Sequence, residues 1–399
     1  MRLRFFADFA PPTRLVLVIA TLFALANSLS GMFVSLFLWS GGASLRQIAI
    51  YNIAVWGSIL LFAPAAGALA KRRGAASPTQ VGLLLYVLFY GLLLLIGARA
   101  IQFMIPLGLL SGAAVCFWSL GSNILYVEVT HDRDRDRFFS IQGLFGTITS
   151  LLAPLLSGTM IGWIGQKAGY ATIFSLSFAF FLLAALWALR TNSPAKGGKL
   201  ELLDVMRRPD PLWQRSLKAH FLLGLRDLYG FLFNLTIFVA LGSESRLGRY
   251  SFLFGCLTLA SYTFLSRRLK PENRLRWFTF GGLGVFAAAS VLGFGLSWPA
   301  LLTHALLAAL FAPLAQIPWT TISYQAIGED GQKRRHEYMV AREIPLGLGR
   351  VCMALLFLAV QPYLERMGPR ALGLFLVATG LSYLLISLYI RPALKQQAT

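Results

Sequence analysis

Residues 372–390 read LGLFLVATGLSYLLISLYI, a stretch without a single charged side chain. A helix needs about 20 mostly apolar residues to cross the hydrocarbon core of a bilayer. The run from Leu83 to Ile96, LLLYVLFYGLLLLI, is also apolar on every side, which is typical of a helix embedded in lipid or deeply buried. Strands of a membrane barrel would instead alternate over ~10 residues. Both stretches therefore predict membrane-spanning helices.

The whole chain follows the same pattern. Hydrophobic residues make up 57% of it and charged residues 13%, and the mean hydropathy is +0.66, which places it far from soluble domains. Short polar or basic connectors divide the apolar runs. We predict an all-α membrane protein of about twelve helices, with spans at residues 14–39, 46–70, 78–98, 101–127, 138–165, 168–190, 217–242, 247–266, 277–296, 299–327, 338–364 and 368–390.

The net charge of +20 indicates an orientation and not a nucleic-acid partner. With the N-terminus inside, one side of the membrane receives nearly all the basic clusters, as the positive-inside rule requires. We therefore expect a multi-pass protein of the cytoplasmic (inner) membrane with both termini cytoplasmic, surrounded by lipid and without bound nucleic acid. The cytoplasmic basic groups are Arg2, Arg4, Arg14, Lys71–Arg73, Arg133–Arg137, the 190–218 region, Arg267–Arg276, Lys333–Arg335, Arg391 and Lys395.

An internal repeat relates the two halves at an offset of 199 to 201 residues. Trp118 then falls on Trp319, Gln142 on Glu343, Gly146 on Gly347, and Asn27 on Arg226. Each match is weak alone, but together with basic connectors that recur at equivalent places they favour a duplication. We predict an N-terminal six-helix bundle (1–190), a cytoplasmic linker (191–216) and a C-terminal six-helix bundle (217–399). Residues 200–206 are expected to form a short amphipathic helix at the membrane surface.

The connector after the second span carries a family signature. Residues 67–74, GALAKRRG, resemble the signature loop of the major facilitator superfamily, Gly-x-Leu-Ala-Asp-Arg-x-Gly followed by basic residues. The resemblance implies two pseudo-symmetric six-helix bundles that give alternating access to a central site. Lys71 stands where the family normally has an aspartate that takes part in a charge relay. The resemblance assigns a conformational role to Gly67, Leu69, Lys71, Arg72 and Gly74.

The fifth span contains a second motif. Residues 149–158, TSLLAPLLSG, are similar to the Gly-x-x-x-Gly-Pro-x-x-Gly-Gly motif of the exporter-type branches. Small residues let helix backbones approach closely, and a proline bends the helix, which would seal one side of the pathway. Glu128, at the end of the fourth span, is also assigned a conformational role. We expect its carboxylate to take part in a cytoplasmic gate or in an ion pair of the adjoining loop. The motif residues are Thr149, Ala153, Pro154, Ser157 and Gly158.

Ionisable groups inside the membrane are the main candidates for a site, because burying a charge in lipid is costly. Arg226 and Asp227 lie in the seventh span, and Arg342, Glu343 and Arg350 lie in the eleventh. Two interpretations stay open. The charges form a structural ion-pair network between the two helices, or Asp227 or Glu343 exchanges a proton while an arginine tunes it or contacts an anionic group.

Neutral polar and aromatic side chains extend this set. Asp227 and Asn234 share a helical face, as do Gln316, Trp319 and Ser323 in the tenth span. Such a face would stack on a sugar, an aromatic compound or a cationic group, or simply pack in the core. His304 is expected to be a core histidine or otherwise a member of a proton relay. The remaining candidates for the substrate and proton pathway are Asn27, Trp118, Asn123, Gln142 and Tyr324.

Enzymatic and metal chemistry find no support in the sequence. No phosphate loop, nucleophile elbow or His-Glu-x-x-His motif is present, and the three cysteines, expected in the core, are too scattered for a disulfide or metal site. We expect a monomeric, proton-coupled secondary transporter of a small organic solute, without a cofactor, with export favoured by the fifth-span motif. The alternatives are an exporter of amphiphiles, lipid-linked substrates or drugs, and a membrane scaffold or sensor that transports nothing.

Overall fold

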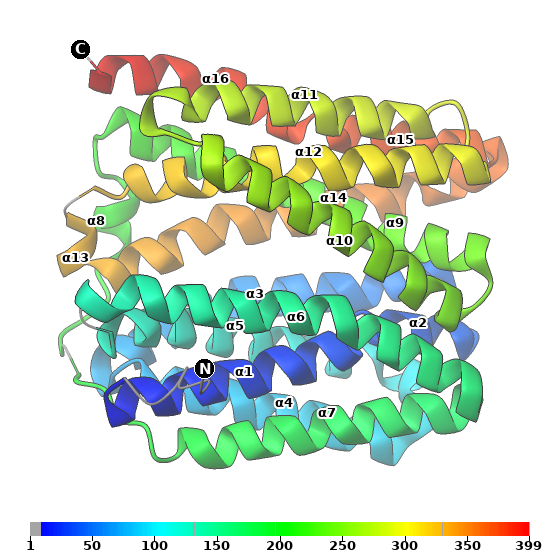
Figure 1. Cartoon of the computed structure of the whole chain (residues 1–399), viewed down its shortest axis with the longest axis horizontal. Coiled ribbons are helices and arrows are strands. Elements are labelled where there is room, and N and C mark those ends of the chain that lie inside the picture. The colour runs from blue at the N-terminus through cyan, green and yellow to red at the C-terminus, as the bar shows by residue number, and fades with distance from the viewer. Residues whose placement is uncertain (1–8, 131, 196, 329, 399) are drawn as a thin grey trace. The chain divides into compact units, whose positions relative to one another are not determined.

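The computed structural model describes residues 9–130, 132–195, 197–328 and 330–398, and within these residues every regular element is a helix. Arg2 and Arg4 lie outside the described residues, as do the side chains of Arg133 and Lys395. Figure 1 shows the course of the chain. The elements are α1 (Pro11–Ser30), α2 (Phe33–Ser40), α3 (Leu45–Arg73), α4 (Ala76–Ile96), η1 (Gly97–Phe103), α5 (Met104–Glu128), α6 (Asp132–Ile164), α7 (Gln166–Ala188), α8 (Leu202–Met206), α9 (Pro211–Leu241), α10 (Glu244–Arg268), η2 (Pro271–Asn273), α11 (Arg274–Leu292), α12 (Trp298–Gln325), α13 (Asp330–Lys333), α14 (Arg335–Met367), α15 (Pro369–Gly380) and α16 (Ser382–Ala398).

The all-α fold with about twelve spans is confirmed. Ten segments of the described chain are long and apolar enough to cross a membrane, and one of them, Ala76–Glu128, contains both α4 and α5. The missing span is α10, whose apolar stretch is diluted by serines, threonines and flanking arginines. The first and last predicted spans are each interrupted briefly, beside Gly31 and Gly380, where glycine weakens the helix.

Local signals in the sequence explain several helix ends. Ser44 forms a capping box with Gln47 at the start of α3. Asp210 accepts a hydrogen bond from the backbone N–H of Trp213 (2.8 Å) and is followed by Pro211, so α9 begins there. Gly242 ends α9 in the left-handed conformation, with φ +62°, which glycine adopts without steric cost.

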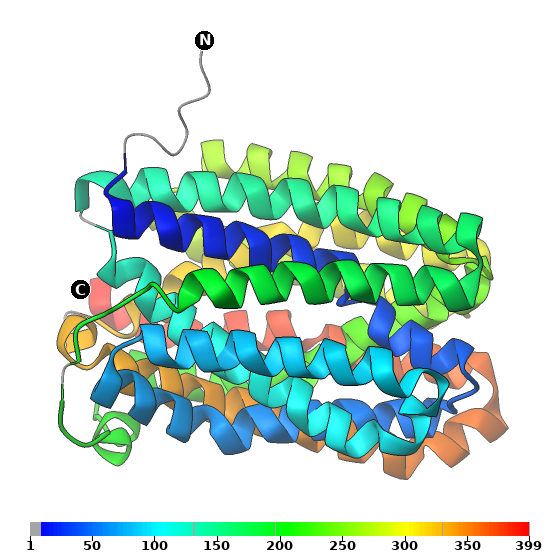
Figure 2. The same ribbon diagram turned by 90° about the horizontal axis from the view of Figure 1, so that it is seen from below.

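The chain divides into two compact units. The first comprises Met1–Glu201 together with Ser243–Ser251, and the second comprises Leu202–Gly242 and Phe252–Thr399. In both views the helices within each unit run along one another (Figures 1 and 2). The packing repeats: α1 contacts α6 and α7 in the first unit, as α9 contacts α14 and α16 in the second, and α4 with α5 corresponds to α11 with α12. Many leucines on the outer faces are exposed, Leu95 at 85% for example, as lipid-facing positions require.

The start of α10 belongs to the first unit. Its Glu244 is buried and accepts hydrogen bonds from Gln166 (3.0 Å) and from the hydroxyl of Tyr170 (3.1 Å). A carboxylate buried in this way needs such donors. Glu244 therefore ties the beginning of α10 to α7.

The linker is docked on each unit separately. On the first unit, Lys71 Nζ donates to the carbonyl oxygen of Lys199 (2.6 Å), and Ser193 Oγ accepts from the backbone N–H of Ala76 (2.8 Å). Gly74, with φ +86°, lies so close to Ser193 that a side chain at this position would overlap the serine backbone.

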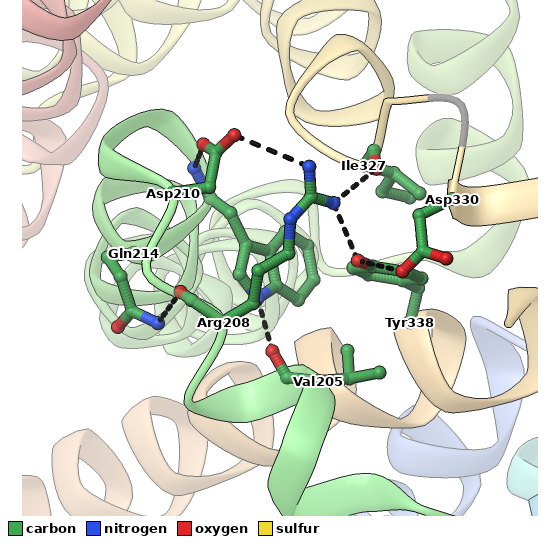
Figure 3. A network of polar contacts seen from close by, with 8 residues as sticks. Val205, Arg208, Asp210, Gln214, Ile327, Asp330 and Tyr338 are labelled. Atoms are coloured by element: carbon green, nitrogen blue, oxygen red, sulfur yellow. Dashed lines mark hydrogen bonds and ion pairs between the residues drawn. The ribbon is translucent and has the colours of Figure 1, made fainter.

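On the second unit, Arg208 fastens the linker to the loop between α12 and α14 (Figure 3). Its guanidinium donates to the carbonyl oxygen of Ile327 (2.9 Å), to the hydroxyl of Tyr338 (2.6 Å) and to Asp210 (3.4 Å), while Tyr338 donates to Asp330 (3.0 Å). Partial burial lowers the pKa of Arg208, but the Tyr338 hydrogen bond and the two nearby carboxylates outweigh this effect, so its pKa is raised. The predicted short helix forms here as α8, in the same corner of the unit as α13 in Figure 1.

Candidate functional site

A cavity of about 280 Å³ opens inside the second unit, between α9, α12, α14 and α16. All five ionisable candidates of the seventh and eleventh spans line it, and so do Gln316, Trp319 and Tyr324. The full lining is His220, Leu223, Arg226, Asp227, Gln316, Trp319, Thr320, Ser323, Tyr324, Arg342, Glu343, Leu346, Arg350 and Tyr383.

Arg350 is the centre of the ionic contacts in this cavity. Its Nε donates to Asp227 Oδ2 across the two helices (2.5 Å), and its Nη1 lies 4.0 Å from Glu343 Oε2 on its own helix. Asp227 is thus the tight partner of Arg350, and Glu343 is a second, looser one. Glu343 also lies 3.9 Å from Arg342 Nε.

Two glycines bring α9 and α14 close enough for the Asp227–Arg350 contact. A methyl group on Gly224 would overlap the carbonyl oxygen of Leu346, and one on Gly349 would overlap that of Phe221. Small residues at such crossings let helix backbones meet directly. The ion pair lies beside this crossing, because Asp227 follows Gly224 by three residues and Arg350 follows Gly349 directly.

Arg226 is held by aromatic rings and not by a carboxylate. Its Cζ lies 4.5 Å from the ring centroid of Tyr383 and 5.9 Å from that of Tyr229, and its Nη1 donates weakly to the Tyr383 hydroxyl (3.5 Å). No carboxylate among the described residues lies within ion-pair distance of it. Arg342 also stacks on an aromatic ring, that of Tyr324, at 5.2 Å.

His220 and Tyr383 also line the cavity, but neither was predicted from the sequence. His220 Nδ1 carries a proton, because its partner at 2.7 Å is the carbonyl oxygen of Ser216, which can only accept. Its position seven residues before Asp227 puts the two on one face of α9, and this spacing was an available signal. Tyr383 lies in an otherwise apolar span, and no local pattern points to it.

His304 has a satisfied environment in the core. Its Nδ1 donates to the carbonyl oxygen of Ala288 (2.8 Å), so the neutral ring has Nε2 left to accept from the hydroxyl of Tyr229. The residue is 2% exposed. These contacts fit a core histidine.

The remaining pathway candidates do not line this cavity. Trp118 is buried in the first unit and stacks on Phe23 with 3.9 Å between ring centroids. Exposed side chains are those of Asn27, Asn123 and, in the second unit, Asn234; Gln142 is half-buried.

The signature-loop residues surround the end of α3. Gly67 and Gly74 are buried, Leu69 and Lys71 are half-buried, and Arg72 is exposed. Lys71, at the family's aspartate position, binds the carbonyl oxygen of Lys199, a contact that a carboxylate cannot make. Glu128, half-buried, is the last residue of α5.

The fifth-span motif makes the close packing expected of it. A methyl group on Gly158 would overlap the carbonyl oxygen of Glu244, and Gly248 lies equally close to the backbone of Pro154. Ser157 donates to the carbonyl oxygen of Leu29 (2.8 Å), while Ala153 and Thr149 are buried. The motif therefore packs α6 against the Glu244–Gly248 part of α10 and against α1.

No cluster of three or more potential metal ligands occurs among the described residues. The three cysteines are free; Cys116 is buried, but Cys256 and Cys352 are exposed, so the expectation that all three lie in the core was wrong for two of them. Cys256 lies in α10 and Cys352 in α14.

Comparisons with known proteins agree with this architecture. A sequence model of the Major Facilitator Superfamily matches residues 16–341. The uncharacterized protein YqgE of Bacillus subtilis (strain 168) is 30% identical over 381 residues, which cover 94% of this chain and 88% of YqgE. An uncharacterized protein from the sodM 3′ region of Geobacillus stearothermophilus is 34% identical over 163 residues, 40% of this chain and 75% of that protein.

Solved structures with the same fold include two transporters. The Escherichia coli fucose:proton symporter FucP superposes with a TM-score of 0.68 at 14% identity, covering 96% of this chain and 98% of that one. The human organic anion transporter MFSD10 superposes with a TM-score of 0.65 at 16% identity, covering 96% and 99%. The chain therefore belongs to the Major Facilitator Superfamily and is a multi-pass membrane transporter, not an enzyme.

Proposed function

We propose that this transporter moves a small organic solute across the cytoplasmic membrane and couples the movement to protons through Asp227 and Glu343. The observation that carries the proposal is the contact of both carboxylates with one arginine, Arg350, inside a membrane-embedded cavity. Intramembrane carboxylates mark ion and proton pathways in transporters. The likeness to FucP, a fucose:proton symporter, agrees with proton coupling.

The geometry supplies a reason for coupling. Protonation of Asp227 removes the tight partner of Arg350 and leaves the guanidinium with the looser contact to Glu343. The groups that face this pair are Arg226, Arg342, His220, Tyr324 and Tyr383. A proton on either carboxylate thus changes the charge of the cavity by one, and an anion or a second conformation compensates for that change.

We further propose export as the direction, with both termini and the linker cytoplasmic. Export is supported by the resemblance of residues 149–158 to the motif of the exporter-type branches, and by the close backbone packing that this segment makes with Glu244–Gly248. The orientation is supported by the basic clusters.

Proteoliposomes containing purified protein and a pH-sensitive dye test the coupling. Solutes selected by thermal shift are added under an imposed pH gradient, and their accumulation and the proton flux are recorded together. Asp227→Asn and Glu343→Gln should abolish proton-driven accumulation, whereas Glu272→Gln, at an exposed carboxylate of η2, should not. Normal accumulation by both cavity variants would show that these carboxylates do not couple transport to protons.

A further inference from the structure

The cavity of the second unit holds more positive than negative charge. Three arginines line it, Arg226, Arg342 and Arg350, against two carboxylates, Asp227 and Glu343. Arginine stays protonated under all physiological conditions. One positive charge is therefore left over when both carboxylates are ionised, and protonation of a carboxylate or of His220 only increases the excess.

The uncompensated charge can be assigned to Arg226. Both carboxylates lie against Arg350, and Glu343 also faces Arg342. Arg226 has only the ring faces of Tyr383 and Tyr229 and one weak hydrogen bond, and its Nε is buried without a hydrogen-bond partner among the described residues. Cation–π contacts help to hold a guanidinium, but they do not replace a counter-charge in a membrane interior.

The walls around Arg226 suit the rest of an organic molecule. Trp319 and Tyr324 offer aromatic surfaces, Leu223 and Leu346 aliphatic ones, and Thr320 and Ser323 add small polar groups. The lining thus offers polar and apolar surface in about equal shares, which suits a small solute that carries both a charged group and a carbon skeleton. The volume of about 280 Å³ fits a small organic ion.

We propose that this cavity binds an organic anion, with the carboxylate, sulfonate or phosphate of the substrate on Arg226 and its carbon skeleton against Trp319 and Tyr324. This substrate class rests on the proposed transport function and extends it. Arg226 then serves recognition, while Arg350 with its two carboxylates serves coupling. The division of roles follows from the contacts, since Arg226 is the one cavity arginine with no carboxylate of the described residues within ion-pair distance.

Binding is tested on purified protein with ligands of one shape and different charge. Benzoate and benzenesulfonate are the anionic probes, benzamide the neutral one and benzylamine the cationic one, each followed by thermal shift. The anions should raise the unfolding midpoint in a concentration-dependent way, and benzamide and benzylamine should not. Arg226→Gln should weaken anion binding at least about tenfold, as expected for a lost charge-assisted contact.

Arg215→Gln is the matched control. Arg215 lies on the same helix, stacks on an aromatic ring (Tyr389, 5.3 Å) and donates to a carbonyl oxygen, but it is outside the cavity. Anion binding should be unchanged in this variant. Arg226→Lys, which keeps the charge, should retain part of the binding, and this result separates recognition from a loss of folding.

Several results would overturn the inference: no shift with either anion, equal shifts with benzamide, or anion shifts that survive Arg226→Gln. Stabilisation by phosphatidylglycerol nanodiscs alone, dependent on Arg226, would show that Arg226 binds a lipid headgroup and not a soluble substrate.

Flux assays separate this inference from the proposed function. Anion binding without any flux contradicts transport but keeps the anion site, whereas proton-coupled flux of a neutral solute that is insensitive to Arg226→Gln removes the anion site but keeps transport.

Discussion

The two units of the molecule share a helix arrangement but differ in what fills their interiors. In the first unit, Trp118 is stacked on Phe23, and Tyr86 contacts both Phe23 and Phe181 in an aromatic cluster. In the second, the repeat-related Trp319 faces a cavity that contains five charged side chains. One framework therefore supports a packed aromatic core in one unit and an ionic cavity in the other.

Three pairs of equivalent positions carry this difference. Asn27, Gln142 and Thr149 in the first unit correspond to Arg226, Glu343 and Arg350 in the second, at offsets of 199 to 201 residues. Each pair exchanges a neutral residue for a charged one. The five charged side chains of the cavity therefore all belong to the second unit.

The largest effect is expected from Arg350→Met. Asp227 would then lose its arginine partner, and Glu343 would keep only its contact with Arg342. Breaking a buried pair in this way costs about 3–5 kcal/mol. The unfolding midpoint should fall and flux should be lost. Adding Asp227→Asn should recover most of the stability but not the flux. Thr149→Val, at the equivalent position of the first unit, loses one hydrogen bond to Gly146. It should therefore reduce the free energy of unfolding by only about 1 kcal/mol. A loss as large as that of Arg350→Met would contradict the difference between the two units.

Trp118→Ala should reduce stability nearly as strongly, by about 3–4 kcal/mol, because it empties a buried aromatic site. Transport per folded molecule should be retained. Trp319→Ala should also reduce stability, because Trp319 is buried against Phe278, and it should in addition change substrate affinity, since Trp319 lines the cavity. Folded Trp118→Ala protein with altered affinity would place the first-unit tryptophan in the pathway as well.

Gly224→Ala should cost about 1–3 kcal/mol, because the new methyl group forces α9 and α14 apart. The separation also lengthens the Asp227–Arg350 contact, so coupled flux should fall with stability. Gly230→Ala is the control on the same helix, with open space at the position of its Cβ. If both alanine variants unfold at the same midpoint, the helix crossing does not set the geometry of the ionic site.

The smallest effects concern the linker. Arg208→Ala removes hydrogen bonds to Ile327 and Tyr338 and should cost about 1–2 kcal/mol, while Lys71→Ala, on the first unit, should cost about 0.5–1 kcal/mol. Arg207→Ala, an exposed neighbour, should be neutral within error. Thermal unfolding of the three variants decides the order, and an effect of Lys71→Ala above that of Arg208→Ala would reverse it.

Helix number and nearly all span positions could be predicted because every span except that of α10 lies in a long and strongly apolar segment. The cluster of ionisable candidates could be predicted for a similar reason: charges are rare in such spans and therefore conspicuous. Their pairing could not. Glu343 and Arg350 share a helical face, but the tight partner of Arg350 is Asp227 on another helix, and that contact depends on how closely Gly224 and Gly349 let the backbones approach.

Functional residues that no local sequence pattern marks could not be predicted either. Tyr383 enters the cavity from α16, far along the chain, and only the packing of α16 on α9 places it over Arg226. Glu244 was overlooked because it stands at the polar start of a span, where a carboxylate is ordinary. Its burial depends on Gln166 and Tyr170 from a different helix.

The docking of the linker leaves only a short connection that could move when the two units move relative to each other. Lys71 holds the carbonyl oxygen of Lys199, and α8 begins at Leu202, so the segment between these points is at most about 10 Å long when fully extended. In the alternating-access mechanism that we propose, a connection this short would act as a hinge, in which a few backbone dihedrals take up the displacement between the units. Inserting a flexible glycine–serine segment after Leu200 would replace the short hinge by a long flexible linker. We expect this change to slow the alternation between the inward-open and outward-open states without altering any residue of the proposed substrate cavity.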